Sequence, residues 1–236
     1  MMAWLKAWYR KRWLRQHGIK LSVDPGRLPR RATLFMEEGV SIGDVFVAFT
    51  HLQVGTMTYI RSGCELINVS HIGRFCSIAN GVIIGLERAG HPLGWVSSHP
   101  FQYTGTSLRY DMVGKPAIIG HDVWIGRDAL IMEGVEVGIG AVVAARSVVT
   151  ENVPDYAIVA GTPARIVGRR HRMDICTALL ASAWWELPVE CLQKLPMNHP
   201  EAFLESLPRC GGVAVKPLCV RVTSTDQALL KIDETP

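Results

Sequence analysis

Apolar residues recur every six positions along the middle of the chain, and this period is the strongest pattern in the sequence. The first series is apolar throughout and runs Met36, Ile42, Ala48, Val54, Ile60, Leu66, Ile72, Ile78 and Ile84. A companion series four positions later becomes mostly small after three steps and reads Val40, Phe46, Leu52, Thr58, Cys64, Ser70, Cys76 and Val82. A period of six fits neither an α-helix, which repeats every 3.6 residues, nor a simple strand, which repeats every two.

A second series starts in a new phase and runs Val113, Ile119, Ile125, Ile131, Val137, Val143 and Val149. A short extended run followed by a tight corner satisfies the period, because the branched residue points inward and a small residue or glycine tolerates the corner. Stacked units of this kind bury one continuous core. The two series predict an all-β solenoid; an all-β sandwich with chance spacing is the alternative.

The hexads, such as Ile42-Gly43 and Ile125-Gly126, resemble those of the hexapeptide acyltransferases. This resemblance implies a left-handed parallel β-helix of triangular cross-section, carrying an N-terminal helix, a long inserted loop and C-terminal helices. It also implies a homotrimer with active sites between the subunits. Cys64 and Cys76 fall on small inward positions, where a thiol acts as a compact hydrophobe, so we expect neither to be a nucleophile.

The repeat is interrupted over residues 86–112, and a long irregular insertion in a solenoid is usually functional or disordered. Its segment 90–101, in which His91 is followed by Pro100-Phe101, resembles the loop of the xenobiotic acetyltransferase subgroup. That subgroup contains chloramphenicol and streptogramin acetyltransferases and related sugar O-acetyltransferases. The resemblance makes His91 the general base that deprotonates an acceptor hydroxyl, a role that suits imidazole near pH 7. His99 is the second candidate base.

Aromatic side chains of the insertion form the expected acceptor site. We predict that Trp95, Phe101 and Tyr103 bind the acceptor. The resemblance leaves two acceptor classes open. A hydroxyl of a sugar or polysaccharide precursor is our expectation, and an antibiotic hydroxyl, as in chloramphenicol or a streptogramin, is the alternative.

The second series resembles the coenzyme A groove of the same subgroup over residues 123–126, 143–150 and 160–165. The resemblance places a tryptophan beside the thioester, small residues along the pantetheine arm and basic residues near the phosphates. Acetyl-CoA is therefore the expected co-substrate, without a metal. The residues expected to contact it are Trp124, Ala145, Thr150, Arg165 and Arg169.

We expect three regions: a basic amphipathic helix and linker over 1–35, the catalytic β-helix over 36–167, and a C-terminal helical extension and tail over 168–236. The Trp-rich first helix either packs on the solenoid end, which we favour, or lies on an anionic membrane surface. In the last region, helical patterns cover 173–186 and 189–194. A short strand is expected within 213–222, and a tail or edge helix from Thr223.

Composition and charge narrow the remaining classes. The 236 residues carry a net charge of +4 without a continuous basic face, so we expect no nucleic-acid partner. There is no run of about 18 apolar residues to span a membrane, and charges from Lys6 onward interrupt any apolar leader, so we expect a cytoplasmic protein, with membrane association through the first helix left open. There is no Cys-x-x-Cys pair of the kind that binds zinc.

Two other classes stay open. A metal-dependent carbonic anhydrase of the hexapeptide type binds one zinc with three histidines; here His71 and His121 lie in the repeats and His91 in the insertion, and no motif of that class surrounds them. A solenoid scaffold without activity is the other alternative.

Overall fold

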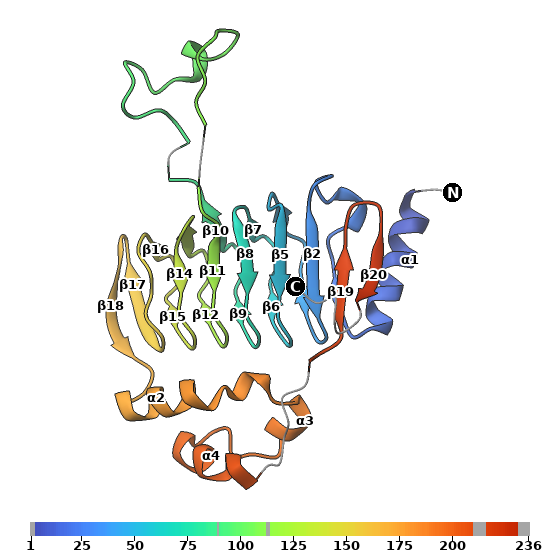
Figure 1. The fold of residues 1–236 in the computed structure, drawn as a ribbon, viewed down its shortest axis with the longest axis vertical. Coiled ribbons are helices and arrows are strands. Elements are labelled where there is room, and N and C mark those ends of the chain that lie inside the picture. Colours follow the sequence, from blue (N-terminus) through green and yellow to red (C-terminus); the bar gives the residue numbers. More distant parts are fainter. Residues whose placement is uncertain (1–2, 89, 112–113, 210–215, 231–236) are drawn as a thin grey trace.

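The computed structural model describes residues 3–88, 90–111, 114–209 and 216–230. Each hexad forms a short strand that ends at a corner, and the strands line up in parallel between successive coils (Figure 1). Partners in one sheet are eighteen positions apart, as for Ile42, Ile60 and Ile78, so three hexads make one coil. The predicted parallel β-helix of hexapeptide repeats is confirmed.

The described strands form three sheets. The first has the order β1 (Lys20–Leu21), β3 (Ser41–Ile42), β6 (Tyr59–Ile60), β9 (Ser77–Ile78), β12 (Trp124–Ile125), β15 (Val142–Val143), β17 (Ala157–Gly161), β18 (Ala164–Arg169). The second has the order β14 (Glu136–Val137), β11 (Ala117–Ile119), β8 (Val69–Ile72), β5 (His51–Val54), β2 (Thr33–Glu37), β19 (Cys219–Val222), β20 (Gln227–Leu230). The third has the order β16 (Val148–Val149), β13 (Leu130–Met132), β10 (Ile83–Leu86), β7 (Glu65–Leu66), β4 (Phe46–Val47).

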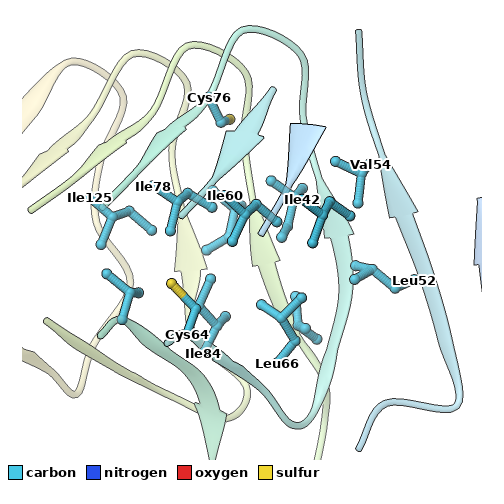
Figure 2. Close-up of a cluster of buried hydrophobic side chains, with 14 of the residues drawn as sticks. Ile42, Leu52, Val54, Ile60, Cys64, Leu66, Cys76, Ile78, Ile84 and Ile125 are labelled. Carbon is cyan, nitrogen blue, oxygen red and sulfur yellow. The ribbon is translucent and has the colours of Figure 1, made fainter. Parts of the chain in front are cut away.

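The core is a set of aliphatic columns that run along the solenoid axis. Figure 2 shows Ile42, Ile60, Ile78 and Ile125 stacked in one such column, with Leu66 among the side chains of the neighbouring one. Each of these side chains is at most 2% exposed. The columns bury one continuous apolar core, because every coil supplies the same type of side chain at the same position.

One step of the predicted series is wrong. Ala48 and Phe46 are exposed, and Val47 pairs with Leu66 in place of Ala48. Val47 follows Ile42 by five residues, and the next inward residue of the series, Val54, follows Val47 by seven. The longer step includes Phe49, whose ring is buried in the same core.

The N-terminal helix covers one end of the solenoid. Helix α1 (Ala3–Gln16) packs against β1 and buries Leu14 completely, and Gly18 ends it with a left-handed φ of 72°. The favoured prediction, a helix packed on the solenoid end, is confirmed. The short 3₁₀ helix η1 (Pro25–Arg27) follows β1. No helix in the described ranges is long and apolar enough to cross a membrane.

The C-terminal extension lies along the opposite side of the solenoid from the inserted loop (Figure 1). It comprises α2 (Met173–Ser182), η3 (Trp184–Glu186), α3 (Val189–Leu192), α4 (Pro200–Ser206) and η4 (Leu207–Arg209). Trp184 packs against Phe75, and Trp185 stacks on His121, which fixes the extension to one corner of the coils. The predicted helices over 173–186 and 189–194 are present, although Ala183, left-handed with φ 44°, ends α2 early.

The expected tail or edge helix from Thr223 is wrong. Strand β20 pairs antiparallel with β19, and β19 pairs antiparallel with β2. The expected strand within 213–222 corresponds to β19, while residues 213–215 lie outside the described part. An uncovered β2 would expose unpaired backbone groups at the sheet edge, and the hairpin satisfies them. Arg10 of α1 holds the hairpin turn by donating to the carbonyl oxygens of Thr223 and Asp226, at 2.6 and 2.7 Å.

Candidate active site

The inserted loop leaves the solenoid after β10 and projects away from the sheets (Figure 1). It has a small core of its own, in which Trp95 meets the edges of Tyr103 and Tyr110 at 5.8 and 5.9 Å between ring centroids. Tyr103 and Tyr110 stack on each other at 5.9 Å. Two of the predicted acceptor residues, Trp95 and Tyr103, are thus half-buried against each other, whereas Phe101 is 63% exposed.

His91 is exposed on this loop, and its surroundings fix the form of its ring. Its Nδ1 lies 2.8 Å from the carbonyl oxygen of Ser98. Because a carbonyl oxygen only accepts, Nδ1 carries the proton in the neutral ring and Nε2 keeps a free lone pair. The Tyr110 hydroxyl donates to the backbone carbonyl of His91 at 2.9 Å and holds the segment in place. This is the arrangement that a general base needs.

His99 has a different position. It precedes the short 3₁₀ helix η2 (Pro100–Gln102), and its Nδ1 accepts the backbone N–H of Phe101 at 3.1 Å. Its own backbone N–H donates to the Ser97 hydroxyl at 3.1 Å. The ring therefore caps a turn, which favours His91 over His99 as the base.

The root of the loop is held by Arg88 and Glu133, two residues that the sequence analysis did not select. The Arg88 backbone N–H donates to Glu133 Oε1 at 2.9 Å, and its Nε donates to the Glu133 carbonyl at 3.0 Å. A second guanidinium nitrogen of Arg88 donates to the carbonyl oxygen of Thr150. Asn68 Nδ2 also donates to Glu133 Oε2, at 3.3 Å. The only sequence signal for this anchor is the position of Arg88 at the loop boundary.

The predicted coenzyme A strip lies on the coils that follow the loop. Trp124 on β12 lies between Ser77 and Val142 in the sheet and points outward, 57% exposed. Ala145 is exposed at the corner after β15. The coils approach each other closely there, since a Cβ at Gly126 would lie 2.5 Å from the Ala145 nitrogen. Thr150 is half-buried, and its carbonyl oxygen is the one that Arg88 binds.

The two predicted phosphate ligands, Arg165 and Arg169, are exposed on β18. Arg165 lies 3.8 Å from Glu151, a loose contact between two exposed side chains. Arg170 is held instead by Asp122 at 2.8 Å and by the Gly140 carbonyl at 2.9 Å. Two exposed cations thus lie on the last strand of the sheet that also contains β12 and β15, whereas Arg170 is held by contacts within the fold.

Within one chain the candidate residues form two separate groups. Figure 1 shows the loop that carries His91 standing clear of the sheets that carry Trp124 and Arg165. The sequence resemblance places base and cofactor strip in one site, and a single chain does not bring them together.

The zinc hypothesis gains no support. The rings of His71 and His121 are 6.2 Å apart, while His91 lies on the projecting loop. His121 Nδ1 accepts the Arg74 backbone N–H at 2.9 Å. Burial lowers the pKa of His121 to about 4, and Coulombic repulsion from His71 and Arg74 acts in the same direction. No group of three or more potential ligands is placed to bind a metal ion within the described ranges.

The buried cysteines behave as small core residues. Burial raises the pKa of Cys76 to about 12 and also raises the pKa of Cys64. Both thiols are turned into the core and stay protonated near pH 7, which agrees with the expectation that neither is a nucleophile.

Comparison with known proteins adds independent evidence. Residues 116–151 match the family model described as the hexapeptide repeat of succinyl-transferase. A chloramphenicol acetyltransferase of Escherichia coli is 38% identical over 130 residues, which cover 52% of this chain and 62% of that protein. A probable macrolide acetyltransferase of Lysinibacillus sphaericus is 35% identical over 145 residues, covering 58% of this chain and 80% of that protein.

Two solved structures show a partial likeness. The polySia specific acetyltransferase NeuO is 29% identical with a TM-score of 0.46, covering 63% of this chain and 72% of NeuO. A galactoside acetyltransferase in complex with coenzyme A is 26% identical with a TM-score of 0.44, covering 57% of this chain and 68% of that one.

The chain covers less than two thirds of the length of the chloramphenicol acetyltransferases that it matches. For the Escherichia coli protein the share is 62%. It covers 80% of the macrolide relative at 35% identity, and the repeat model matches coils that the structure confirms. On these sequence matches, the chain belongs to the hexapeptide-repeat acetyltransferase family.

Proposed function

We propose that this protein is an acetyl-CoA-dependent O-acetyltransferase in which His91 is the general base. The observation that carries the proposal is the hydrogen bond from His91 Nδ1 to the Ser98 carbonyl, which leaves the Nε2 lone pair free on an exposed loop. Family membership supports acetyl transfer as the reaction.

The surface chemistry of the strip supports coenzyme A as its ligand. Trp124 and Ala145 leave an open face of small side chains and backbone beside an exposed indole. The exposed guanidinium groups of Arg165 and Arg169 offer charge for phosphate groups. Bound acetyl-CoA would supply the acetyl group as a thioester, and relatives named as acetyltransferases support this co-substrate.

In the proposed reaction His91 Nε2 removes the proton of the acceptor hydroxyl as the oxygen attacks the acetyl carbon. The new C–O bond replaces the C–S bond, and the imidazolium returns the proton to the leaving sulfur. Backbone amides of the coils that carry the strip would stabilise the developing oxyanion. The base must lie within hydrogen-bond distance of the acceptor hydroxyl, and that hydroxyl must reach the thioester held on the strip. The loop that carries His91 therefore has to lie against a strip.

We propose that the strip belongs to a neighbouring copy in a homotrimer. The loop stands clear of its own strip and exposes large apolar side chains at Leu93 (82%), Phe101 (63%) and Leu108 (50%). Exposed apolar side chains gathered on one projecting segment favour a protein partner. Closed rotational symmetry would then form each site from the loop of one copy and the strip of the next.

The proposed acceptor is a hydroxyl of a sugar or polysaccharide precursor, made in the cytoplasm. The projecting loop supports a large acceptor, because Phe101 is 63% exposed and Trp95 and Tyr103 are only half-buried. A second candidate, an antibiotic hydroxyl, is favoured by the relatives named chloramphenicol and macrolide acetyltransferases.

A panel of acceptors distinguishes the two classes. Purified protein is incubated with acetyl-CoA and, in turn, chloramphenicol, a macrolide, nucleotide sugars and glycans, while thiol release is followed. We expect turnover with a sugar acceptor. Turnover with an antibiotic alone would reverse the order of the two acceptors and leave the role of His91 intact.

Substitution of His91 tests the mechanism. We expect His91→Ala to lower turnover on the order of a hundredfold or more, with coenzyme A binding retained. His99→Ala is the matched control, because it removes an imidazole from the same loop and should cause a much smaller loss. Equal losses in both variants, or full activity of His91→Ala, would remove His91 from the mechanism.

A further inference from the structure

Helix α1 has a second face that the solenoid does not cover. Leu14 and the half-buried Trp13 pack inward, whereas Trp4, Trp8 and Tyr9 are 63%, 51% and 58% exposed. Arg12 lies one turn after Trp8 with its guanidinium carbon 5.6 Å from the Trp8 ring centroid, and Trp8 meets Tyr9 edge-on at 5.1 Å. We call Trp4, Trp8, Tyr9, Arg12 and Arg15 the outer face of α1.

Charge is concentrated at the same end of the molecule. Residues 1–31 hold nine of the chain's 25 lysines and arginines and one of its 21 acidic residues, Asp24, which gives a net charge of +8. The remaining residues hold sixteen basic and twenty acidic residues, a net charge of −4. Several of these cations, including Arg27, Arg30 and Arg31, are exposed beside the helix.

We propose that the outer face of α1 docks the protein on an anionic lipid surface. Tryptophan and tyrosine rings prefer the headgroup region of a bilayer, and each lysine or arginine near an anionic surface adds to the attraction. The helix is fixed to the solenoid end by Leu14 and by the contacts of Arg10 with the β19–β20 turn, so the aromatic side chains are held outward before binding.

The charge distribution favours lipid over a second copy of this chain. Two ends that each carry +8 repel each other when they meet face to face. The outer face of α1 also places aromatic rings beside arginine, which suits the headgroup region of an anionic bilayer, whereas nucleic-acid binding favours a continuous basic face.

Vesicle co-sedimentation tests the proposal with the full chain. The probes are neutral phosphatidylcholine vesicles and vesicles with about 30 mol% phosphatidylglycerol, a charge density at which basic clusters bind strongly. We expect binding to the anionic vesicles alone, weakened by added salt. Trp4→Ala/Trp8→Ala and Arg12→Glu/Arg15→Glu should each lower binding at least tenfold.

Arg127→Glu/Arg146→Glu is the matched control. It makes the same change in net charge at two exposed arginines, 74% and 85% exposed, on coils beyond the loop. This variant should keep vesicle binding within about twofold, and thermal unfolding should show that all variants fold.

Three results would overturn the proposal: no binding to anionic vesicles at low salt, an equal loss in the control variant, or binding that ignores lipid charge. A change of oligomer mass in Trp4→Ala/Trp8→Ala without vesicle binding would assign the face to a second copy instead. Binding of an oligonucleotide in place of anionic vesicles would assign it to nucleic acid. None of these readouts depends on acetyl transfer.

Discussion

The coils and the inserted loop bury their side chains in different ways. In the coils, each inward residue meets its equivalent one coil away, as Ile119 does with Ile72 and Val137, and is shielded from solvent. In the loop, three aromatic rings pack on one another, and Arg88 and Glu133 hold the root. Stability therefore comes mainly from the repeat, whereas the proposed base lies in the insertion, where side chains remain accessible.

The largest effect on stability is expected from the coil core. Ile119→Ala removes a fully buried side chain and should lower the free energy of unfolding by about 3 kcal/mol. The neighbouring Ile118 is 38% exposed on the same strand, so Ile118→Ala should lower it by less than about 1 kcal/mol. Urea unfolding of both variants measures the difference. Similar losses would mean that β11 is not oriented as described.

A pH effect is expected from the corner beneath the C-terminal extension. Burial and neighbouring positive charges lower the pKa of His121 to about 4, against an ordinary value near 6.5, so the folded protein prefers the neutral ring. The stabilisation is complete above about pH 6.5, is lost as the pH falls toward 4, and then levels off. The loss should be on the order of 1–3 kcal/mol after allowance for partial exposure.

His121→Gln isolates this effect. Urea unfolding between pH 7 and pH 5 should show a smaller decline in the variant than in the parent protein. Part of the decline should remain, because burial also lowers the pKa of the neighbouring His71. The pKa of Glu37 is also lowered, through its hydrogen bonds with Arg74 and Thr56 against the desolvation that opposes them, but its stabilisation is lost only near and below its ordinary range. An unchanged decline between pH 6.5 and pH 5 would contradict the assignment to His121.

The smallest effect is expected at the loop root. Arg88→Ala removes the guanidinium bonds to Glu133 and Thr150 and should lower kcat about tenfold, equivalent to about 1.4 kcal/mol, with little change in Tm. Arg109→Ala is the control, since Arg109 bonds only to nearby loop carbonyls of Thr106 and Leu108 among the contacts described. Partial rescue by Arg88→Lys would support a positioning role, whereas an equal loss of Tm would indicate a structural one.

Much of the fold could be predicted from the sequence, because successive hexads place the same type of apolar side chain at the same inward position. The second series is buried from Ile119 to Val149 without exception. The first series fails at Ala48, where one step is short and the next is long, so counting alone cannot locate the inward residue. The β19–β20 hairpin was also missed, because its partner β2 lies some 180 positions earlier in the chain.

The site was predictable only in part. His91 and Trp124 were selected by their resemblance to family motifs, and the tautomer of His91 became clear only from its contact with Ser98. Arg88 and Glu133 carry no motif, since their pairing joins residues 45 positions apart. In the proposed trimer, loop and strip meet between two chains, an arrangement that the family resemblance implies and that a single copy does not contain.

Complementation between two inactive variants tests the central claim most directly. His91→Ala lacks the proposed base, and Ala145→Trp blocks the proposed strip, so each homogeneous protein should be inactive. Under random mixing of the two chains, about one quarter of the intersubunit sites combine an intact loop with an intact strip. The account predicts that co-expressed, co-purified mixtures regain thiol release up to about that fraction of the parent activity. Mixtures that contain both chains and stay at the background of the single variants would contradict it.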